Sequence, residues 1–139
     1  MSTTTTSTHV GTVADLYGAF GRGDVPFILD HFADDISWEE GLRVTEMPWF
    51  QRRTGKQQVA EFFQILNQSL VLSTFDPQMI VGDGDTVIAV IRIAGSIVSN
   101  GNPVEEDLWV HLWKFGADGK VASFRHIADL AREEIPFKN

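Results

Sequence analysis

The chain has no cysteine among its 139 residues. Disulfide frameworks, cysteine-ligated zinc, iron–sulfur clusters and thiol nucleophiles are therefore excluded. Basic side chains are also scarce, because eleven lysines and arginines stand against nineteen aspartates and glutamates, a formal charge of −8. Such a field repels phosphates, so neither general nucleic-acid binding nor attachment to an anionic membrane surface is expected.

Long apolar runs are absent as well. The longest, Val87–Ile91, is cut by Arg92 and is far too short to cross a bilayer. No apolar run precedes the first basic residue, Arg22, so no secretory signal is expected. We expect a cytoplasmic protein, and the lack of cysteine fits a reducing compartment.

The composition is that of one ordinary globular domain, with 43% hydrophobic and 22% charged residues. Residues 1–9 are rich in serine and threonine and are predicted to form a disordered tail. The domain is expected over residues 10–135, with residues 136–139 as a C-terminal tail.

The first half of the chain has helical patterns. Thr12 and Asp15 form a possible capping box before apolar residues that share one helical face: Val13, Leu16, Tyr17 and Phe20. Asp24 is expected to cap a second, short helix. Thr54 and Gln57 form another possible capping box, before a helical stripe made of Val59, Phe62, Phe63 and Leu66. Residues 36–38, between these helices, are predicted to form a short strand.

The second half is predicted to be an antiparallel sheet. Hairpin turns are indicated by three dipeptides: Asp83-Gly84, Asn100-Gly101 and Asp118-Gly119. Their wide spacing implies long strands, and Gly95 and Pro103 suggest bends or bulges. We predict an α+β fold, in which three N-terminal helices pack in a long curved antiparallel sheet and leave a pocket at its open end.

Strand alternation sorts the side chains of residues 107–115 into two faces. One face has Asp107, Trp109, His111, Trp113 and Phe115, and the other has Leu108, Val110 and Leu112. Because both faces are largely apolar, one is expected to line the core and the other to be covered by a partner subunit. A homodimer through the sheet is therefore predicted.

Counting back from the turn at Asp118-Gly119 places His111 opposite His126 on one face of the sheet. Two imidazoles in an apolar site cannot both be charged cheaply, so we predict coupled titration with at least one ring neutral at pH 7. A neutral ring could act as hydrogen-bond acceptor or base. The alternative is a pair of core histidines with no chemical role.

Further candidates come from single residues. Tyr17 is either a core tyrosine or an oxyanion donor, and Glu40, two residues after Trp38, is either a pocket base with a raised pKa or a solvated strand end. The face of Arg92 is left open, and Asp129 either orients a pocket group or is solvated. A flat, apolar ligand would be lined by aromatic side chains, the candidates being Trp38, Trp49, Phe63, Trp109, Trp113 and Phe124. No metal-ligand spacing and no phosphate-binding loop is present, so neither a metal nor a cofactor is expected.

Several short sequence segments, in their order along the chain, resemble the SnoaL-like and ketosteroid-isomerase-like branch of the nuclear transport factor 2-like superfamily. These segments are Ala14-Asp15-Leu16-Tyr17, Gly23-Asp24, residues 31–38, Thr54-Gly55-Lys56, residues 59–63 and residues 115–121. The resemblance covers most of the chain, from about Val13 to Leu130. It implies a cone-shaped α+β barrel with a deep apolar pocket, in a homodimer formed through the sheet.

The resemblance also implies roles for single residues. Tyr17 falls where the isomerases keep a hydrogen-bond donor to a substrate oxygen, Glu40 where they keep a carboxylate base, and His111 where they keep a second oxygen-binding residue. His126 departs from the family pattern, because cyclases and epoxide hydrolases tend to have an aspartate there. The function implied is cofactor-independent isomerisation, aldol cyclisation or dehydration of a polyketide-, steroid- or terpenoid-like carbonyl compound. The alternative is a non-catalytic binding protein for a small hydrophobic ligand.

Overall fold

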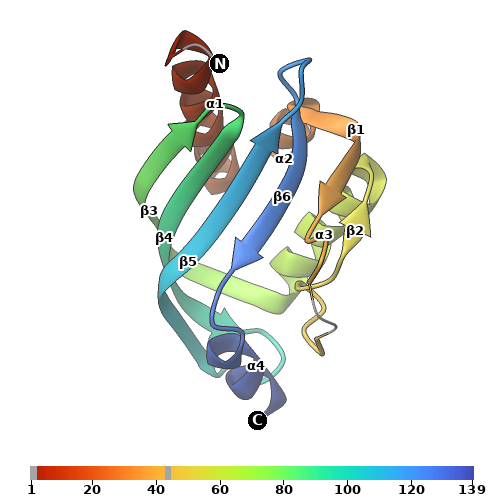
Figure 1. Cartoon of the computed structure of the whole chain (residues 1–139). Coiled ribbons are helices and arrows are strands. Elements are labelled where there is room, and N and C mark those ends of the chain that lie inside the picture. The colour runs from red at the N-terminus through yellow and green to blue at the C-terminus, as the bar shows by residue number, and fades with distance from the viewer. Residues whose placement is uncertain (1–2, 43–44) are drawn as a thin grey trace.

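One curved six-stranded sheet, flanked by helices, forms the molecule (Figure 1). The computed structural model describes residues 3–42 and 45–139. In chain order the elements are α1 (Thr3–Arg22), α2 (Val25–Asp30), β1 (Phe32–Trp38), β2 (Arg53–Thr54), α3 (Lys56–Ser69), β3 (Leu70–Asp83), β4 (Thr86–Ile97), β5 (Pro103–Phe115), β6 (Val121–Ile127) and α4 (Ala131–Lys138). The strand order is β2-β1-β6-β5-β4-β3, antiparallel except between β1 and β6. The predicted α+β class is therefore confirmed.

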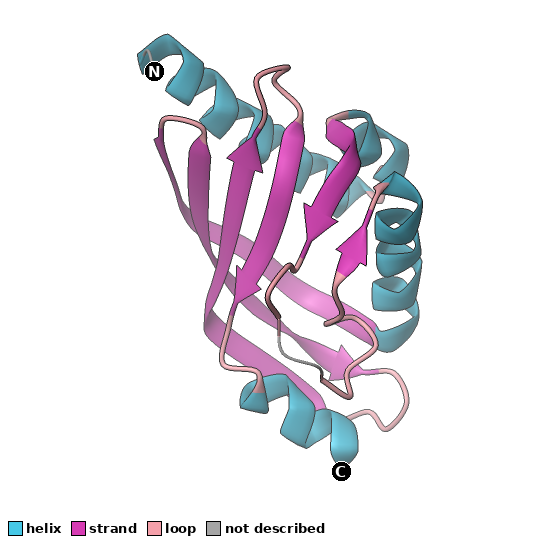
Figure 2. Ribbon diagram, turned by 45° about the vertical axis from the view of Figure 1, so that its right-hand side comes forward, coloured by secondary structure: helices cyan, strands magenta, loops and turns pink. Residues whose placement is uncertain are grey.

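The long strands curve around the interior. Strands β3, β4 and β5 have 14, 12 and 13 residues, as the wide turn spacing predicted. A Cβ on Gly95 would lie 2.0 Å from the carbonyl oxygen of Val71, so only glycine fits where β3 and β4 shift register. The predicted bend at Gly95 is thus confirmed. Figure 2 shows the curved sheet with α1 and α3 along one side of it and α4 near its lower end.

The N-terminal segment corrects the sequence prediction. Residues 3–9 belong to α1 rather than to a disordered tail, while residues 1–2 lie outside the described residues. The helix is anchored because His9 is buried, stacks on Phe115 at 4.0 Å between ring centroids, and lies 3.4 Å from Asp85. Thr12 and Asp15 consequently lie inside a helix and cap nothing.

The C-terminal segment corrects a second prediction. Residues 136–138 belong to α4 instead of forming a tail. The side-chain amides of Asn100 and Asn102 each donate a hydrogen bond of 2.8 Å to the carbonyl oxygen of Pro136. The β4–β5 turn therefore fastens α4 to the sheet.

One predicted helix cap is present in the structure and another is absent. Asp24 caps α2 as expected, accepting a hydrogen bond of 3.2 Å from the amide of Phe27. The predicted box of Thr54 and Gln57 is wrong, because α3 follows Gly55 without a side-chain cap. The predicted strand at residues 36–38 is present as the end of the longer β1.

The alternation predicted for β5 holds from Trp109 to Phe115, and a β-bulge interrupts it before Trp109. Trp109 pairs with Ile91, whereas Glu106 pairs with Ile93, so two residues on β5 oppose one on β4 between these pairs. Asp107, predicted to face inward, is consequently exposed, and Glu106 is buried in its place.

The outer face of the sheet is partly apolar. Leu108 is 65% exposed, and Val110 and Leu112 are half-buried. Arg92 also lies on the outside, with its guanidinium 3.9 Å from Glu105. The homodimer stays a prediction that this face supports. Among the described residues, no helix is both long and apolar enough to span a membrane.

Candidate functional site

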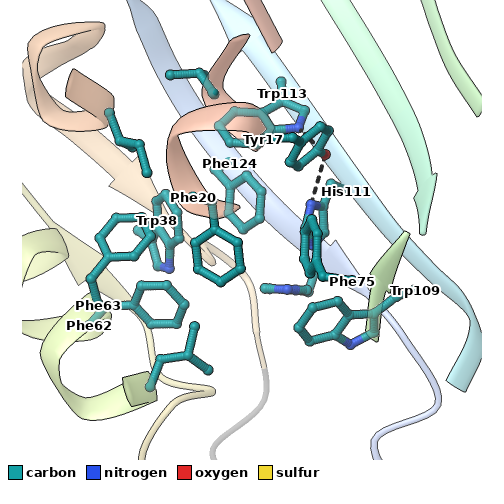
Figure 3. A pocket seen from close by; sticks show the side chains of 14 residues that line it. Tyr17, Phe20, Trp38, Phe62, Phe63, Phe75, Trp109, His111, Trp113 and Phe124 are labelled. Carbon is teal, nitrogen blue, oxygen red and sulfur yellow. Dashed lines mark hydrogen bonds between the residues drawn. The ribbon is translucent and has the colours of Figure 1, made fainter. Parts of the chain in front are cut away.

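An aromatic cavity, here called the inner chamber, lies between the sheet and helices α1–α3 (Figure 3). Its volume is about 50 Å³. It is lined by Leu16, Tyr17, Phe20, Ile28, Trp38, Phe62, Phe63, Leu66, Phe75, Trp109, His111, Trp113, Phe124 and His126. Five of the six aromatic residues predicted to line a pocket are therefore there. Trp49 is not, because its indole Nε1 instead donates to Glu133 Oε1 at 3.0 Å, outside the chamber.

The Tyr17 hydroxyl is held from both sides. Trp113 Nε1 donates to it at 2.9 Å, and it lies 2.9 Å from His111 Nδ1, as the dashed line in Figure 3 marks. Because an indole N–H can only donate, the hydroxyl accepts from Trp113, and its own buried proton is satisfied when it points to His111 Nδ1. This hydrogen-bond network assigns the proton of neutral His111 to Nε2. Burial raises the pKa of Tyr17, so the phenol stays protonated.

A second polar unit joins β6 to the end of β1. Glu39 Oε2 lies 3.1 Å from His126 Nδ1, and Glu39 Oε1 accepts a hydrogen bond from the His126 backbone amide. Both side chains are buried. A carboxylate at Nδ1 holds the ring in one orientation and leaves Nε2 as the nitrogen available for proton transfer. Sequence reasoning missed Glu39.

The two histidines face one another as predicted. His111 pairs with His126 across β5 and β6, and their ring centroids lie 4.4 Å apart at 89°. Burial, with a smaller contribution from the nearby His126, holds the pKa of His111 well below its usual value, so this ring is neutral at pH 7. Whether the two rings titrate together stays a prediction.

Within residues 3–42 and 45–139, three polar atoms of the inner chamber are buried without a hydrogen-bond partner: Trp38 Nε1, His111 Nε2 and His126 Nε2. An unpaired buried polar atom costs stability, and a ligand that pairs with it recovers that cost. These atoms make the chamber a candidate binding site rather than only a core.

Glu40 does not belong to this site. Its side chain is exposed, and its Oε2 accepts a hydrogen bond of 3.0 Å from Ser37 Oγ. The alternation that placed it beside Trp38 ends one residue earlier, because Glu39 has a φ of +61°. This left-handed residue turns the Glu39 carboxyl inward and sends Glu40 out. The predicted placement of Glu40 in the pocket is therefore wrong.

A second group of buried acids lies outside the chamber, against α4. Glu133 accepts hydrogen bonds from both Trp49 and Trp109, the latter at 3.1 Å, and its carboxyl interacts electrostatically with that of Glu106. Burial, with Glu133 as its neighbour, raises the pKa of Glu106 to about 10, so this carboxyl is protonated at pH 7. Asp129, close by, is exposed and accepts a bond from the Ala131 amide at the start of α4. Asp129, in the segment between β6 and α4, therefore contacts the start of α4 rather than the chamber.

A wider hollow of about 570 Å³, here called the vestibule, adjoins the inner chamber. It lies between α1, α3 and β3 and shares four side chains with the chamber: Phe20, Phe63, Leu66 and Phe75. A ligand that enters the chamber from this side must pass these side chains. Phe20 and Phe75 are in contact, with ring centroids 4.8 Å apart.

Comparison with known proteins places this architecture in the nuclear transport factor 2-like class. A protein of that class from Burkholderia pseudomallei, of unknown function, superposes with a TM-score of 0.82 at 22% identity, covering 94% of this chain and 98% of that one. Another from Burkholderia xenovorans gives a TM-score of 0.80 at 28% identity, with coverages of 94% and 97%. A candidate polyketide cyclase from Xanthomonas campestris gives 0.76 at 20% identity, with coverages of 96% and 98%. No curated protein matches the sequence.

The family is narrower than the class. The model of the SnoaL-like domain matches residues 13–124, so the chain belongs to the SnoaL-like family. The resemblance noted from the sequence is thereby confirmed.

Proposed function

We propose that this protein is a cofactor-independent acid–base enzyme that acts on a small, apolar carbonyl compound of polyketide, steroid or terpenoid type. The observation that carries the proposal is the buried Glu39–His126 pair, whose second ring nitrogen is unpartnered at the wall of an aromatic cavity. The similarity to a candidate polyketide cyclase and to a candidate isomerase from Rhodopseudomonas palustris supports the same class of chemistry.

In this proposal His126 Nε2 is the general base. It removes a proton from the carbon next to the substrate carbonyl, and the imidazolium that forms is stabilised by Glu39 through Nδ1. The negative charge that develops on the carbonyl oxygen is then met by the N–H at His111 Nε2. Tyr17 keeps His111 in that tautomer by donating to its Nδ1. Returning the proton at another carbon gives isomerisation, attack on a second carbonyl gives aldol cyclisation, and loss of a hydroxyl gives dehydration.

The test is exchange of the protons next to the carbonyl of 2-tetralone in deuterated water, followed by NMR. We expect the protein to accelerate exchange above buffer and Glu39→Gln to lower the rate constant by about 10²–10⁴. Glu40→Gln is the matched control, because this neighbouring carboxylate is exposed, and it should leave the rate unchanged. Equal rates in the wild type and Glu39→Gln would overturn the assignment of the base.

One observation favours the second candidate, a non-catalytic binding protein. The inner chamber is only about 50 Å³ and is walled almost entirely by aromatic carbon. Binding needs only shape, whereas catalysis needs a base. If 2-tetralone binds with no exchange above buffer, the binding protein is the correct reading.

A further inference from the structure

The unpartnered atoms of the inner chamber define a specific ligand chemistry, which deepens the proposed function and rests on it. His111 is neutral and protonated on Nε2, because its Nδ1 accepts from Tyr17. His126 is directed the other way, because its Nδ1 faces the Glu39 carboxylate, and in the neutral ring that donates from Nδ1 the Nε2 atom has the free lone pair. The two facing rings thus offer one hydrogen-bond donor and one acceptor.

These two atoms do not satisfy each other. The rings are nearly perpendicular, and neither Nε2 has a hydrogen-bond partner although both are buried. The described residues offer these two atoms no alternative partner, and the neighbouring rings of both histidines are those of Phe124 and Trp109. A ligand that pairs with both atoms removes two buried unsatisfied groups at once.

We propose that the chamber recognises a vinylogous acid, a planar compound in which an enol or phenol hydroxyl is conjugated with a carbonyl group on the same edge. The carbonyl oxygen accepts from His111 Nε2–H, and the hydroxyl donates to His126 Nε2. Transfer of the hydroxyl proton to His126 leaves an enolate with its charge shared between two oxygens, which the two ring N–H groups hold. The positive charge on His126 balances the enolate, and Glu39 stabilises that imidazolium through Nδ1. Deprotonation of the carbon between two carbonyls gives the same anion, which connects recognition with the proposed reaction.

The shape of the site fits such a compound entering edge first. The chamber itself has room for little more than the polar edge, whereas the vestibule behind Phe20, Phe63 and Phe75 is about tenfold larger on the same measure. The hydrophobic body of the ligand would therefore lie between these rings. Trp38 Nε1–H, across the Phe124 ring from His111, remains as a donor for a further oxygen of a larger ligand.

The experiment compares three flat bicyclic probes of nearly equal size by calorimetry with the wild-type protein. In 4-hydroxycoumarin the hydroxyl and carbonyl flank one carbon, in 4-methoxycoumarin the donor is blocked, and in coumarin the hydroxyl is missing. We expect 4-hydroxycoumarin to bind about tenfold or more tightly than the other two. Equal affinity for all three would overturn the proposal without any need for a variant.

Two variants then locate the preference. His126→Gln should reduce the discrimination between 4-hydroxycoumarin and coumarin to about twofold or less, because the paired acceptor is lost. His31→Gln is the matched control, since that ring lies outside the chamber and bonds to the Phe27 carbonyl at 2.9 Å. Unchanged discrimination in a folded His126→Gln protein would contradict the proposal.

The outcome is separable from that of the proton-exchange test. Preference for 4-hydroxycoumarin without 2-tetralone exchange would support the recognition chemistry and reject the enzyme. Exchange without preference would do the reverse.

Discussion

Two buried carboxyl groups at different places in the same molecule have opposite surroundings. Glu39 is hydrogen-bonded to an imidazole that opens onto the inner chamber, so its carboxylate can stabilise the imidazolium that forms when a ligand gives a proton to His126. Glu133 instead accepts hydrogen bonds from the indole N–H groups of Trp49 and Trp109 and lies beside Glu106, and it does not line the inner chamber. Burial of an acid is therefore not what marks a site. The Glu39 site is distinguished by the His126 ring, which binds the acid through Nδ1 and presents an unpartnered Nε2 at the wall of the cavity.

The largest expected effects are those of substituting Glu39 and Glu133, which should have similar consequences for stability but different consequences for activity. Both Glu39→Ala and Glu133→Ala should lower the free energy of unfolding by about 3 kcal/mol or more, because each leaves buried donors without a partner. Glu133→Gln, however, should keep the 2-tetralone exchange rate within about threefold of the wild type, unlike Glu39→Gln. Urea denaturation and the NMR exchange assay measure the two effects. If Glu133→Gln abolished exchange, the two acids would form a single functional unit.

The next effect concerns pH and Glu106. Its carboxyl has an ordinary pKa of 4.5 and a folded pKa of about 10, so folding takes up a proton between these values. Stability should therefore fall as pH rises through this range, by up to about 1.4 kcal/mol per pH unit. Glu106→Gln does not titrate, so its stability relative to the wild type should increase steadily with pH. Parallel urea midpoints from about pH 5.5 to 8.5 would show that Glu106 is ionised in the folded protein.

The contribution of His111 to the free energy of unfolding should depend on pH in the opposite direction, over a narrower pH range. Its folded pKa lies below the ordinary 6.5, so the unfolded chain takes up the proton first as pH falls. The wild type should lose stability relative to His111→Gln below pH 6.5, with the same limiting slope of about 1.4 kcal/mol per unit. His31→Gln, outside the chamber, should follow the wild type. A difference between wild type and His111→Gln that does not change with pH would mean that His111 accepts a proton readily when folded.

The smallest expected change in fold stability is at Leu108, which faces outward two residues from the buried Glu106. Leu108→Glu should change the free energy of unfolding of one chain by less than about 0.5 kcal/mol, because the side chain is 65% exposed. If the sheet face forms a homodimer, the same variant should sediment as a monomer at concentrations where the wild type is dimeric. A wild type that is monomeric at micromolar concentration would reject the dimer.

Local chemistry explains which parts of the molecule were predictable from sequence. The His111–His126 pairing was predicted from one turn dipeptide and a period of two, and it holds because a register shift between Lys114 and Phe115 offsets the pairing of Phe115 with Val121. The α2 cap followed from Asp24 alone. The predictions failed where tertiary contacts outweigh local preference. A run of threonines becomes helical because His9 is held against Phe115, and Trp49 leaves the predicted pocket lining because Glu133, 84 residues away, accepts its N–H.

The candidate site was half predictable for the same reason. Tyr17, His111 and His126 lie on regular elements whose faces can be counted. Glu39 lies at a residue with positive φ immediately after β1, and nothing in the sequence around it favours that conformation over the one that would bury Glu40. A non-glycine residue in that region is uncommon, so the ordinary expectation was bound to choose the wrong glutamate.

The bulge in β5 acts on this strand as a frameshift acts on a reading frame. After the bulge in the sequence, odd-numbered residues such as His111 and Trp113 face the interior. Before it, the even-numbered residues Val104 and Glu106 face the interior. A relative that lacks one residue at Asp107 or Leu108 would have a regular strand here, in which the positions of Trp109 and Glu106 lie two apart and both still face inward. Sequences of this family are therefore best compared in two separate blocks, one on each side of Asp107 and Leu108.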